Sequence, residues 1–145
     1  MHIKPILESH LYEISNIYIQ IFNNNPWNEK WTKDIAYKRL KMFYDSDQFI
    51  GTYIETNNQI IGFLFGHKEY YSDSQIFLID EIGVIKEYNN QKIGTKLIDN
   101  LISNLKIINI SQMYAITTRD NSTNLFYEKN NFQIDNDTVL VKRII

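Results

Sequence analysis

The sequence is organised around residues Leu78–Leu105, which read LIDEIGVIKEYNNQKIGTKLIDNLISNL. The run Ile76–Ile85 is apolar and has the length of a strand. A polar elbow, Lys86–Lys92, follows it. Beyond the elbow, apolar residues recur at spacings of three and four, which predicts a helix whose buried face is formed by Ile93, Leu97, Ile98, Leu101, Ile102 and Leu105. The stretch therefore predicts a strand that leads into an amphipathic helix.

The start of this predicted helix suits an anion. Gly94 and Thr95 fall in its first turn, where backbone N–H groups have no partner within the helix. The helix dipole adds roughly half a positive charge there, and Lys92 and Lys96 add mobile charge. A phosphate group would bind well at this point. Strand–loop–helix units are common, so an ordinary crossover with a glycine for close packing fits the same pattern.

Length and composition limit the function classes. The chain of 145 residues is long enough for a core, and we expect one domain, residues 1–145. Its net charge of −2 argues against a nucleic-acid partner, and the absence of cysteine excludes disulfides, zinc–thiolate sites and cysteine nucleophiles. No apolar run reaches the length of a membrane span, and the N-terminus lacks a signal-peptide pattern. A cytoplasmic protein without a membrane partner is the expectation.

Strands and helices alternate along the whole chain. A tight hairpin is expected at Asn57–Asn58, because asparagine tolerates positive φ. Predicted helices begin after the N-cap candidates Ser9 and Thr32, and a short one spans Thr123–Lys129. The expected strands other than Ile76–Ile85 are His2–Ile6, Phe49–Thr56, Gln59–Tyr70, Gln112–Thr118, Phe132–Ile134 and Val139–Ile144.

Residues 81–98, EIGVIKEYNNQKIGTKLI, resemble motif A of the GNAT superfamily of acetyl-CoA-dependent N-acetyltransferases. In that family the elbow reads Gln/Arg-x-x-Gly-x-Gly/Ala and wraps the pyrophosphate of coenzyme A. Aligned without gaps, Asn89 takes the Gln/Arg position, Lys92 the first glycine and Gly94 the last. Two of the three signature positions therefore depart, and Lys92 carries a Cβ where the family allows close backbone approach.

Residues 117–132, TTRDNSTNLFYEKNNF, resemble the second marker of the family, Asn-x-x-Ala-x-x-Phe/Leu-Tyr-x-Lys-x-Gly-Phe. Phe126 and Tyr127 match its Phe-Tyr pair, and Asn131 stands at the glycine. Asp120 stands at the asparagine, where it replaces a donor amide by a carboxylate that only accepts. We expect the neighbouring Asn121 to take over the contact with the pantetheine arm.

The resemblance covers almost the whole chain and implies the α/β (α+β) GNAT fold. That fold has a mixed central sheet, here expected to hold six to seven strands, splayed between the fourth and fifth and flanked by four helices. The implied reaction transfers an acetyl group from acetyl-CoA to an amine of a small molecule or peptide. Because cysteine is absent, we expect direct attack in a ternary complex. The residues that the resemblance assigns to coenzyme A are Ile82, Gly83, Val84, Asn89, Asn90, Gln91, Lys92, Ile93, Gly94, Thr95, Asp120, Asn121 and Tyr127.

Two side chains are candidates for proton transfer. By the family pattern, Tyr127 protonates the departing thiolate; the alternative is an aromatic residue packed on the sheet with its hydroxyl bonded. An acceptor amine must lose a proton, at a cost of roughly 4 kcal/mol at pH 7. Glu81, with Asp80 behind it, is the candidate base, although a structural salt bridge is an equal alternative. Strand alternation puts these carboxylates on opposite faces, so only one would face the acceptor.

The loop NNNPWNEKW, residues 23–31, helps to wall the acceptor pocket in this fold. Trp27 and Trp31 offer apolar faces, Glu29 offers a charge for a cation, and Tyr70 lies beyond the third strand. Such a lining suits a positively charged amine and resembles the small-molecule branch that includes aminoglycoside acetyltransferases. The sequence does not distinguish an aminoglycoside from a polyamine, an amino acid or a peptide amine.

Other interpretations stay open. Lys92 and Asp120 favour a non-catalytic acyl-CoA-binding sensor or regulatory module, whereas the intact Tyr127 favours an enzyme. A nucleotide-binding α/β domain is disfavoured, because no Gly-x-Gly-x-x-Gly or P-loop is present. The three histidines fit no metal-ligand pattern, so we expect no metal, with His67 a surface residue. Oligomeric state is not readable here, although dimers are frequent in the family and a homodimer is one expected assembly.

Overall fold

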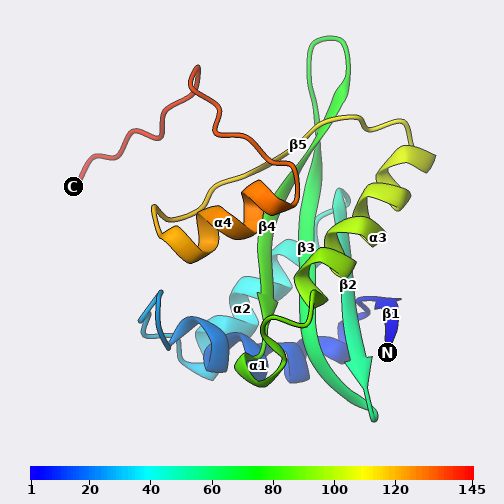
Figure 1. Ribbon diagram of the computed structural model, residues 1–145, viewed down its shortest axis with the longest axis vertical. Helices are drawn as coiled ribbons and strands as arrows, with labels where there is room; N and C mark the ends of the chain where they lie inside the picture. Colours follow the sequence, from blue (N-terminus) through cyan, green and yellow to red (C-terminus); the bar gives the residue numbers. More distant parts are fainter.

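A sheet covered by helices on both faces forms the body of the molecule, as the computed structural model of residues 1–145 shows (Figure 1). Its five strands lie in sequence order. The first four are antiparallel neighbours, and the last pair is parallel. The strands are β1 (His2–Pro5), β2 (Phe49–Thr56), β3 (Gln59–Tyr70), β4 (Gln75–Val84) and β5 (Met113–Ala115).

Four helices pack on this sheet. The predicted apolar face of α3 (Ile93–Ile107) is buried except for Ile102, which is half-buried. The buried apolar residues of α1 (Leu11–Phe22) also recur at helical spacing: Leu11, Ile14, Ile17, Tyr18, Ile21 and Phe22. The other two helices are α2 (Lys33–Tyr44) and α4 (Asn121–Lys129). In Figure 1, α3 crosses in front of the sheet while α1 and α2 lie behind it. The mixed sheet with four helices confirms the predicted α+β class.

Two connections determine the topology. The β2–β3 hairpin turns at Asn57 and Asn58, whose φ values of 50° and 58° confirm the predicted tight turn. Because β4 and β5 are parallel, the chain needs a crossover between them, and α3 provides it. The single turn of 3-10 helix at Lys86–Tyr88 separates β4 from α3. The predicted strand–elbow–helix unit is therefore present.

The expectation of six to seven strands is wrong. Residues Phe132–Ile134 and Val139–Ile144 form no strand, and residues 133–145 make no backbone–backbone hydrogen bond. The predicted strand Gln112–Thr118 is shortened to Met113–Ala115. A strand needs a partner ladder, and β5 pairs over only three residues, so its short outer edge stabilises no further strand within this chain.

All of the helices are too short or too polar to cross a membrane.

Candidate functional site

The edge of β4 opens where β5 leaves it. Phe77–Ile79 pair with Met113–Ala115, whereas β4 continues to Val84. The side of β4 that faces β5 is therefore unpaired from Asp80 to Val84, and we call this stretch the splay. It contains Ile82–Val84, which the resemblance assigns to coenzyme A, and β4 and β5 separate here as expected. An unpaired edge presents N–H and C=O groups to an extended ligand.

Gly83 is among the residues that the resemblance assigns to coenzyme A, but its missing side chain serves packing inside the protein. A Cβ at Gly83 would lie 2.9 Å from Cδ1 of Ile21 and 3.2 Å from Cζ of Phe63. The glycine thus allows α1 to pack closely on β4. Its backbone, which lies in the splay, is all that it offers a ligand.

The elbow before α3 presents free backbone donors. Lys92 is the N-cap and adopts a left-handed conformation, with φ 59° and ψ 23°, and Asn90 has φ 62°. No backbone N–H from Asn90 to Thr95 donates a hydrogen bond within the chain, and no side chain caps the helix. Lys92 thus adopts the conformation that a glycine would adopt at lower cost. The donors of the first turn can hold an anion.

Gly94 joins the elbow to α4. A Cβ on Gly94 would lie 2.7 Å from Cε2 of Phe126, so the absent side chain lets α4 pack directly on the first turn of α3. Phe126 precedes Tyr127, and the two rings meet edge to face with centroids 5.3 Å apart. The glycine of the first motif therefore positions the tyrosine of the second.

Tyr127 is half-buried, and its ring also meets Phe132 edge to face at 5.1 Å. Its hydroxyl makes no hydrogen bond within the chain and is not sealed from solvent. Burial, with a smaller contribution from the carboxylate of Glu81, raises the pKa of Tyr127 to about 12. The hydroxyl is therefore protonated at neutral pH and lies within electrostatic range of Glu81.

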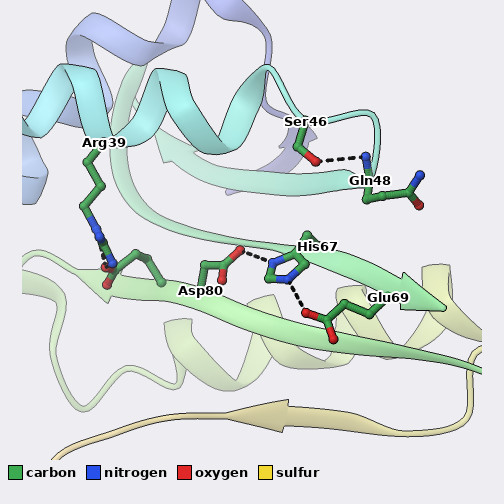
Figure 2. Close-up of polar contacts among 7 residues, drawn as sticks. Arg39, Ser46, Gln48, His67, Glu69 and Asp80 are labelled. Atoms are coloured by element: carbon green, nitrogen blue, oxygen red, sulfur yellow. Dashed lines mark hydrogen bonds and ion pairs between the residues drawn. The ribbon is translucent and has the colours of Figure 1, made fainter. Parts of the chain in front are cut away.

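Glu81 is held by three donors that meet at one of its oxygens. The Tyr18 hydroxyl donates to Oε1 over 2.9 Å, and Arg39 donates to the same atom through Nε over 3.0 Å and Nη2 over 2.9 Å. The side chain is only 14% exposed. Figure 2 shows Arg39 extending from α2 toward the carboxylate on β4. The second oxygen, Oε2, has no partner in the chain and is not sealed from solvent.

The environment of Glu81 favours proton exchange. Burial raises its pKa above the ordinary value, although Arg39 and Tyr18 oppose the shift. The negative charge of Glu29 makes a smaller contribution that also raises the pKa of Glu81. A carboxylate with a raised pKa and one free oxygen can accept a proton and attract an ammonium group. The salt bridge and the functional interpretation are thus compatible, because they use different oxygens.

A β-bulge changes the expected relation of Asp80 to Glu81. Phe65 pairs with Glu81 and Gly66 pairs with Ile79, so Asp80 is an extra residue in β4. Strand alternation fails at a bulge, and the prediction that the carboxylates lie on opposite faces is wrong. Arg39 acts on the pKa of both carboxyl groups. Both acids therefore lie near the same guanidinium.

His67 is a member of this polar cluster rather than a free surface residue. Its Nδ1 lies 2.7 Å from Oδ2 of Asp80 and its Nε2 lies 3.0 Å from Oε1 of Glu69 (Figure 2). Burial of the ring opposes its protonation, but the two carboxylates raise the pKa of His67 above the usual value. His67, Glu69 and Asp80, which lie on β3 and β4, thus form a second charged cluster next to Glu81 in the sheet.

The two tryptophans of the loop between α1 and α2 pack on the core. Trp31 meets the Tyr18 ring edge to face at 5.2 Å, and the guanidinium of Arg39 lies 5.6 Å from its ring. Trp27 meets Phe22 at 5.1 Å. The buried Nε1 of Trp31 has no hydrogen-bond partner. Trp31 thus belongs to the group around Glu81, and Trp27 lies one layer further out.

Tyr70 is not part of this group. It pairs with Gln75 at the tip of the β3–β4 hairpin, which extends away from the helices in Figure 1, and it is 76% exposed. Phe65, which pairs with Glu81, precedes Tyr70 by five residues along β3, which corresponds to about 17 Å at 3.3 Å per residue. The structure therefore separates Tyr70 from the other predicted acceptor residues.

Asp120 caps α4. Its Oδ2 accepts from the Thr123 backbone N–H at 3.1 Å, from the Thr123 hydroxyl at 3.2 Å and from the Ser122 hydroxyl. The hydrogen bond from Ser122, and then that from Thr123, lower the pKa of Asp120. This N-cap gives a physical reason for an aspartate at this position of the motif. Asn121, the first residue of α4, is exposed and leaves its side-chain amide free.

Tyr18 and Arg39 are not among the site residues that the sequence predicts. The helical spacing of Tyr18 indicates only a buried residue, and its ring is buried on α1. Arg39 gave no signal, because one arginine on an amphipathic helix is usually a solvated residue. Its role depends on the packing of α2 over β4, which no local pattern predicts.

Comparison with known proteins agrees with this geometry. The sequence profile described as "Acetyltransferase (GNAT) domain" matches residues 46–134, which is more than half of the chain. No curated protein sequence matches significantly.

Solved structures resemble the chain over its full length. A possible acetyltransferase from Clostridium difficile superposes with a TM-score of 0.85 at 15% identity, covering 99% of this chain and 97% of that one. An aminoglycoside 6'-N-acetyltransferase from Acinetobacter baumannii gives 0.77 at 19%, covering 99% and 98%. A ribosomal-protein-alanine N-acetyltransferase from Brucella melitensis gives 0.80 at 13%, covering 99% and 100%. At these identities the superpositions establish the fold.

Proposed function

The chain belongs to the GNAT acetyltransferase family, and from that membership we propose that it acetylates a positively charged amine of a small molecule, with residues 1–145 as one catalytic domain. It is an acetyl-CoA-dependent N-acetyltransferase, which transfers an acetyl group to an amine. The acceptor class is the proposed part. Two observations support it: Oε2 of Glu81 has no partner in the chain, and Trp31 packs on Tyr18, which bonds the other oxygen of Glu81. Several similar structures are aminoglycoside 6'-N-acetyltransferases.

The proposed site rests on one observation: free backbone N–H groups of β4 and of α3 lie near the Tyr127 hydroxyl, which makes no hydrogen bond within the chain. The splay of β4 and the first turn of α3 both have free N–H donors, and Gly94 brings α4 with Tyr127 against that turn. These groups fit coenzyme A: the elbow from Asn89 to Thr95 would hold its diphosphate, and the splay from Glu81 to Val84 would hold its extended arm. Asn121 would contact the arm through its free amide.

When bound, acetyl-CoA supplies the acetyl group as a thioester. In our proposal Tyr127 is the proton donor for the leaving sulfur, because its hydroxyl is unbonded and protonated at neutral pH. A backbone N–H of the splay would polarise the carbonyl oxygen. The amine gains the acyl group and loses a proton, and the sulfur gains a proton, so the reaction needs no covalent relay through the protein.

Glu81 serves the acceptor in this proposal. Its anchored Oε1 fixes the carboxylate, and its free Oε2 is available to an ammonium group. Deprotonation of such an amine costs roughly 4 kcal/mol at pH 7. A carboxylate with a raised pKa reduces this cost, because it is a stronger base and accepts the proton more readily. Tyr18 and Arg39 act through Glu81 and are positioning residues. Trp31 and Glu29 would line the acceptor side.

A panel of amines, scored by thiol release from acetyl-CoA, tests the acceptor class. The panel contains an aminoglycoside, linear polyamines, amino acids and short peptides with a free N-terminus. We expect turnover with multiply charged small molecules and little with peptides. Preferred acetylation of the peptides would contradict the proposed class. Co-purified coenzyme A with no turnover on any amine would leave only the binding function.

A further inference from the structure

A row of four charged side chains runs along β3 and β4 toward their hairpin (Figure 2). The row consists of His67, Glu69, Asp80 and Glu81. The bulge of β4 brings Asp80 into the row, opposite Gly66 of β3. A Cβ at Gly66 would lie 1.9 Å from the carbonyl oxygen of Leu78, so only a glycine lets the two backbones approach in this way. The row therefore depends on a backbone feature that the sequence supports at one position.

Both ring nitrogens of His67 face carboxylates. Nδ1 lies 2.7 Å from Oδ2 of Asp80, and Nε2 lies 3.0 Å from Oε1 of Glu69. An ionised carboxylate only accepts hydrogen bonds, so both contacts are hydrogen bonds only when both nitrogens carry a proton. Burial lowers the pKa of His67, but the two carboxylates raise it above the usual value. The arrangement is that of a charged imidazolium between two carboxylates.

Asp80 depends on this imidazolium. Its side chain is only 13% exposed, and a buried carboxylate that loses its partner is strongly destabilised. Burial raises the pKa of Asp80, whereas the hydrogen bond and the charge of His67, and then the charge of Arg39, lower it. Arg39 is thus a second cation whose charge reaches Asp80.

Arg39 has donors for more than one carboxylate. Its Nε and Nη2 donate to Oε1 of Glu81, and its Nη1 donates to no group within the chain. The other groups that act on the pKa of Glu81 are Tyr18 on α1 and Glu29 in the loop between α1 and α2, and Glu81 itself acts on Tyr127 of α4. None of these three carries a positive charge. Arg39 is therefore the cation that balances Glu81.

We propose that His67 is a positioning residue for the acetyl transfer: its charged ring pairs with Asp80, so that Arg39 stays on Oε1 of Glu81 and Oε2 stays free for the acceptor. This inference rests on the proposed role of Glu81. A neutral residue at position 67 would leave Asp80 to compete for Arg39. Glu81 would then lose hydrogen bonds that lower its pKa, and its carboxylate would become available only at higher pH.

The substitution His67→Gln removes the charge and keeps an amide that can donate to Asp80. We expect the acidic limb of the kcat/KM profile to shift upward by about 0.5–1 pH unit, a part of the effect of one nearby opposite charge. The KM for acetyl-CoA should stay unchanged. His2→Gln, the same substitution on exposed β1, is the matched control and should leave the profile unchanged. An unmoved limb in His67→Gln would overturn the proposal.

Two double variants locate the coupling. Asp80→Asn, added to His67→Gln, removes the competing carboxylate and should return the limb to its wild-type position. In an Arg39→Met background, Asp80 has no guanidinium to compete for, so His67→Gln should cause no further shift. An equal shift with and without Arg39 would assign the effect to the charge of His67 alone and would overturn the positioning role.

A carbon-13 NMR titration of the Glu81 carboxyl group follows the same coupling without turnover. The free protein is labelled at glutamate, and Glu81→Gln identifies the signal. We expect His67→Gln to raise the titration midpoint of this carboxyl group. An unmoved midpoint would overturn the coupling, whatever the amine panel shows. A raised midpoint with an unmoved kcat/KM profile would instead contradict Glu81 as the base, and with it the role of His67 in turnover.

Discussion

The candidate site has a backbone side and a side-chain side, which are built from different groups. On the backbone side, β4 and the first turn of α3 present N–H and C=O groups. On the side-chain side, α1 and α2 supply Tyr18 and Arg39, which bond Glu81, and α4 supplies Tyr127. Backbone N–H and C=O groups are kept when a side chain is substituted, whereas a side-chain cluster can lose its function when a single functional group is removed. This difference explains how Lys92 and Asp120 can depart from the family motif while the fold around them is kept.

The largest effect is expected on the side-chain side, at Tyr127. Tyr127→Phe removes the proposed proton donor and keeps the ring contacts with Phe126 and Phe132. We expect kcat to fall by roughly 10²–10⁴-fold, the usual contribution of a positioned acid. Acetyl-CoA affinity, measured by calorimetry, should change less than threefold. Tyr70→Phe is the matched control at the hairpin tip and should leave kcat unchanged.

An unchanged kcat in Tyr127→Phe would remove the proposed acid. A large loss in Tyr70→Phe would instead show that the hairpin tip approaches the acceptor during turnover. The two variants thus separate the side-chain cluster from the hairpin.

The second effect concerns Arg39. Arg39→Met keeps the stem but leaves Glu81 without its cation, so the buried carboxylate loses two hydrogen bonds. Because the Arg39 side chain is 33% exposed, we expect a loss of about 1–3 kcal/mol in the free energy of unfolding, below the value for a fully buried pair. Lys38→Met on the same helix, whose partner Asp34 is exposed, should cost less than about 0.5 kcal/mol.

Arg39→Met should also move the pH profile of kcat/KM. Arg39 lowers the pKa of Glu81, so its removal raises that pKa, and the carboxylate becomes available only at higher pH. The acidic limb of the profile should shift upward. An unshifted limb, with the expected loss of stability, would leave Arg39 a structural role only.

A smaller effect is expected on the backbone side. Lys92 has φ 59°, which costs an L-residue about 1–2 kcal/mol, and glycine recovers this at an entropic cost of about 0.5–1 kcal/mol. Lys92→Gly should therefore raise the free energy of unfolding in urea by about 0.5–1 kcal/mol. Asn90→Gly, at φ 62°, should gain less, because asparagine tolerates this region. A destabilised Lys92→Gly protein would contradict the assigned strain.

The smallest effect is the pH dependence of stability due to His67. The carboxylates of Asp80 and Glu69 raise the pKa of His67 above 6.5 in the folded protein, against the effect of burial. The stabilisation is therefore complete below about pH 6.5 and is lost as pH rises through the folded-state pKa. His67→Gln should flatten the urea-unfolding curve in that range. Asp80→Asn should flatten it more than Glu69→Gln, because Glu69 is more exposed.

The local patterns of the sequence predict most of the fold. The apolar face of α1, the turn at Asn57–Asn58 and the strand–elbow–helix unit all follow from periodicity and from residues that tolerate positive φ. The two strands predicted near the C-terminus do not form. A strand pattern such as Val139–Ile144 shows that a segment suits a sheet, but it does not show which strand would pair with it. In this chain the partner edge, β5, pairs over only three residues.

The candidate site is only partly visible in the sequence. Each of the two motifs is a short continuous segment, so one points to the elbow with Gly94 and the other to Tyr127. Arg39 is 42 residues from Glu81, and their contact depends on how α2 packs over β4. The bulge at Asp80 also has no sequence signal, since it depends on the register between β3 and β4. Contacts of this kind require the tertiary structure.

Hydrogen exchange with and without acetyl-CoA tests most directly the claim that backbone groups hold this ligand. The amides of Asn90–Thr95, and those amides of the splay that point away from β3, have no partners that slow their exchange in the free protein. We expect acetyl-CoA to slow exchange in peptides that cover residues 81–84 and 90–95, in the wild type and in Tyr127→Phe alike. Protection confined to other segments, with these two unchanged, would contradict the account.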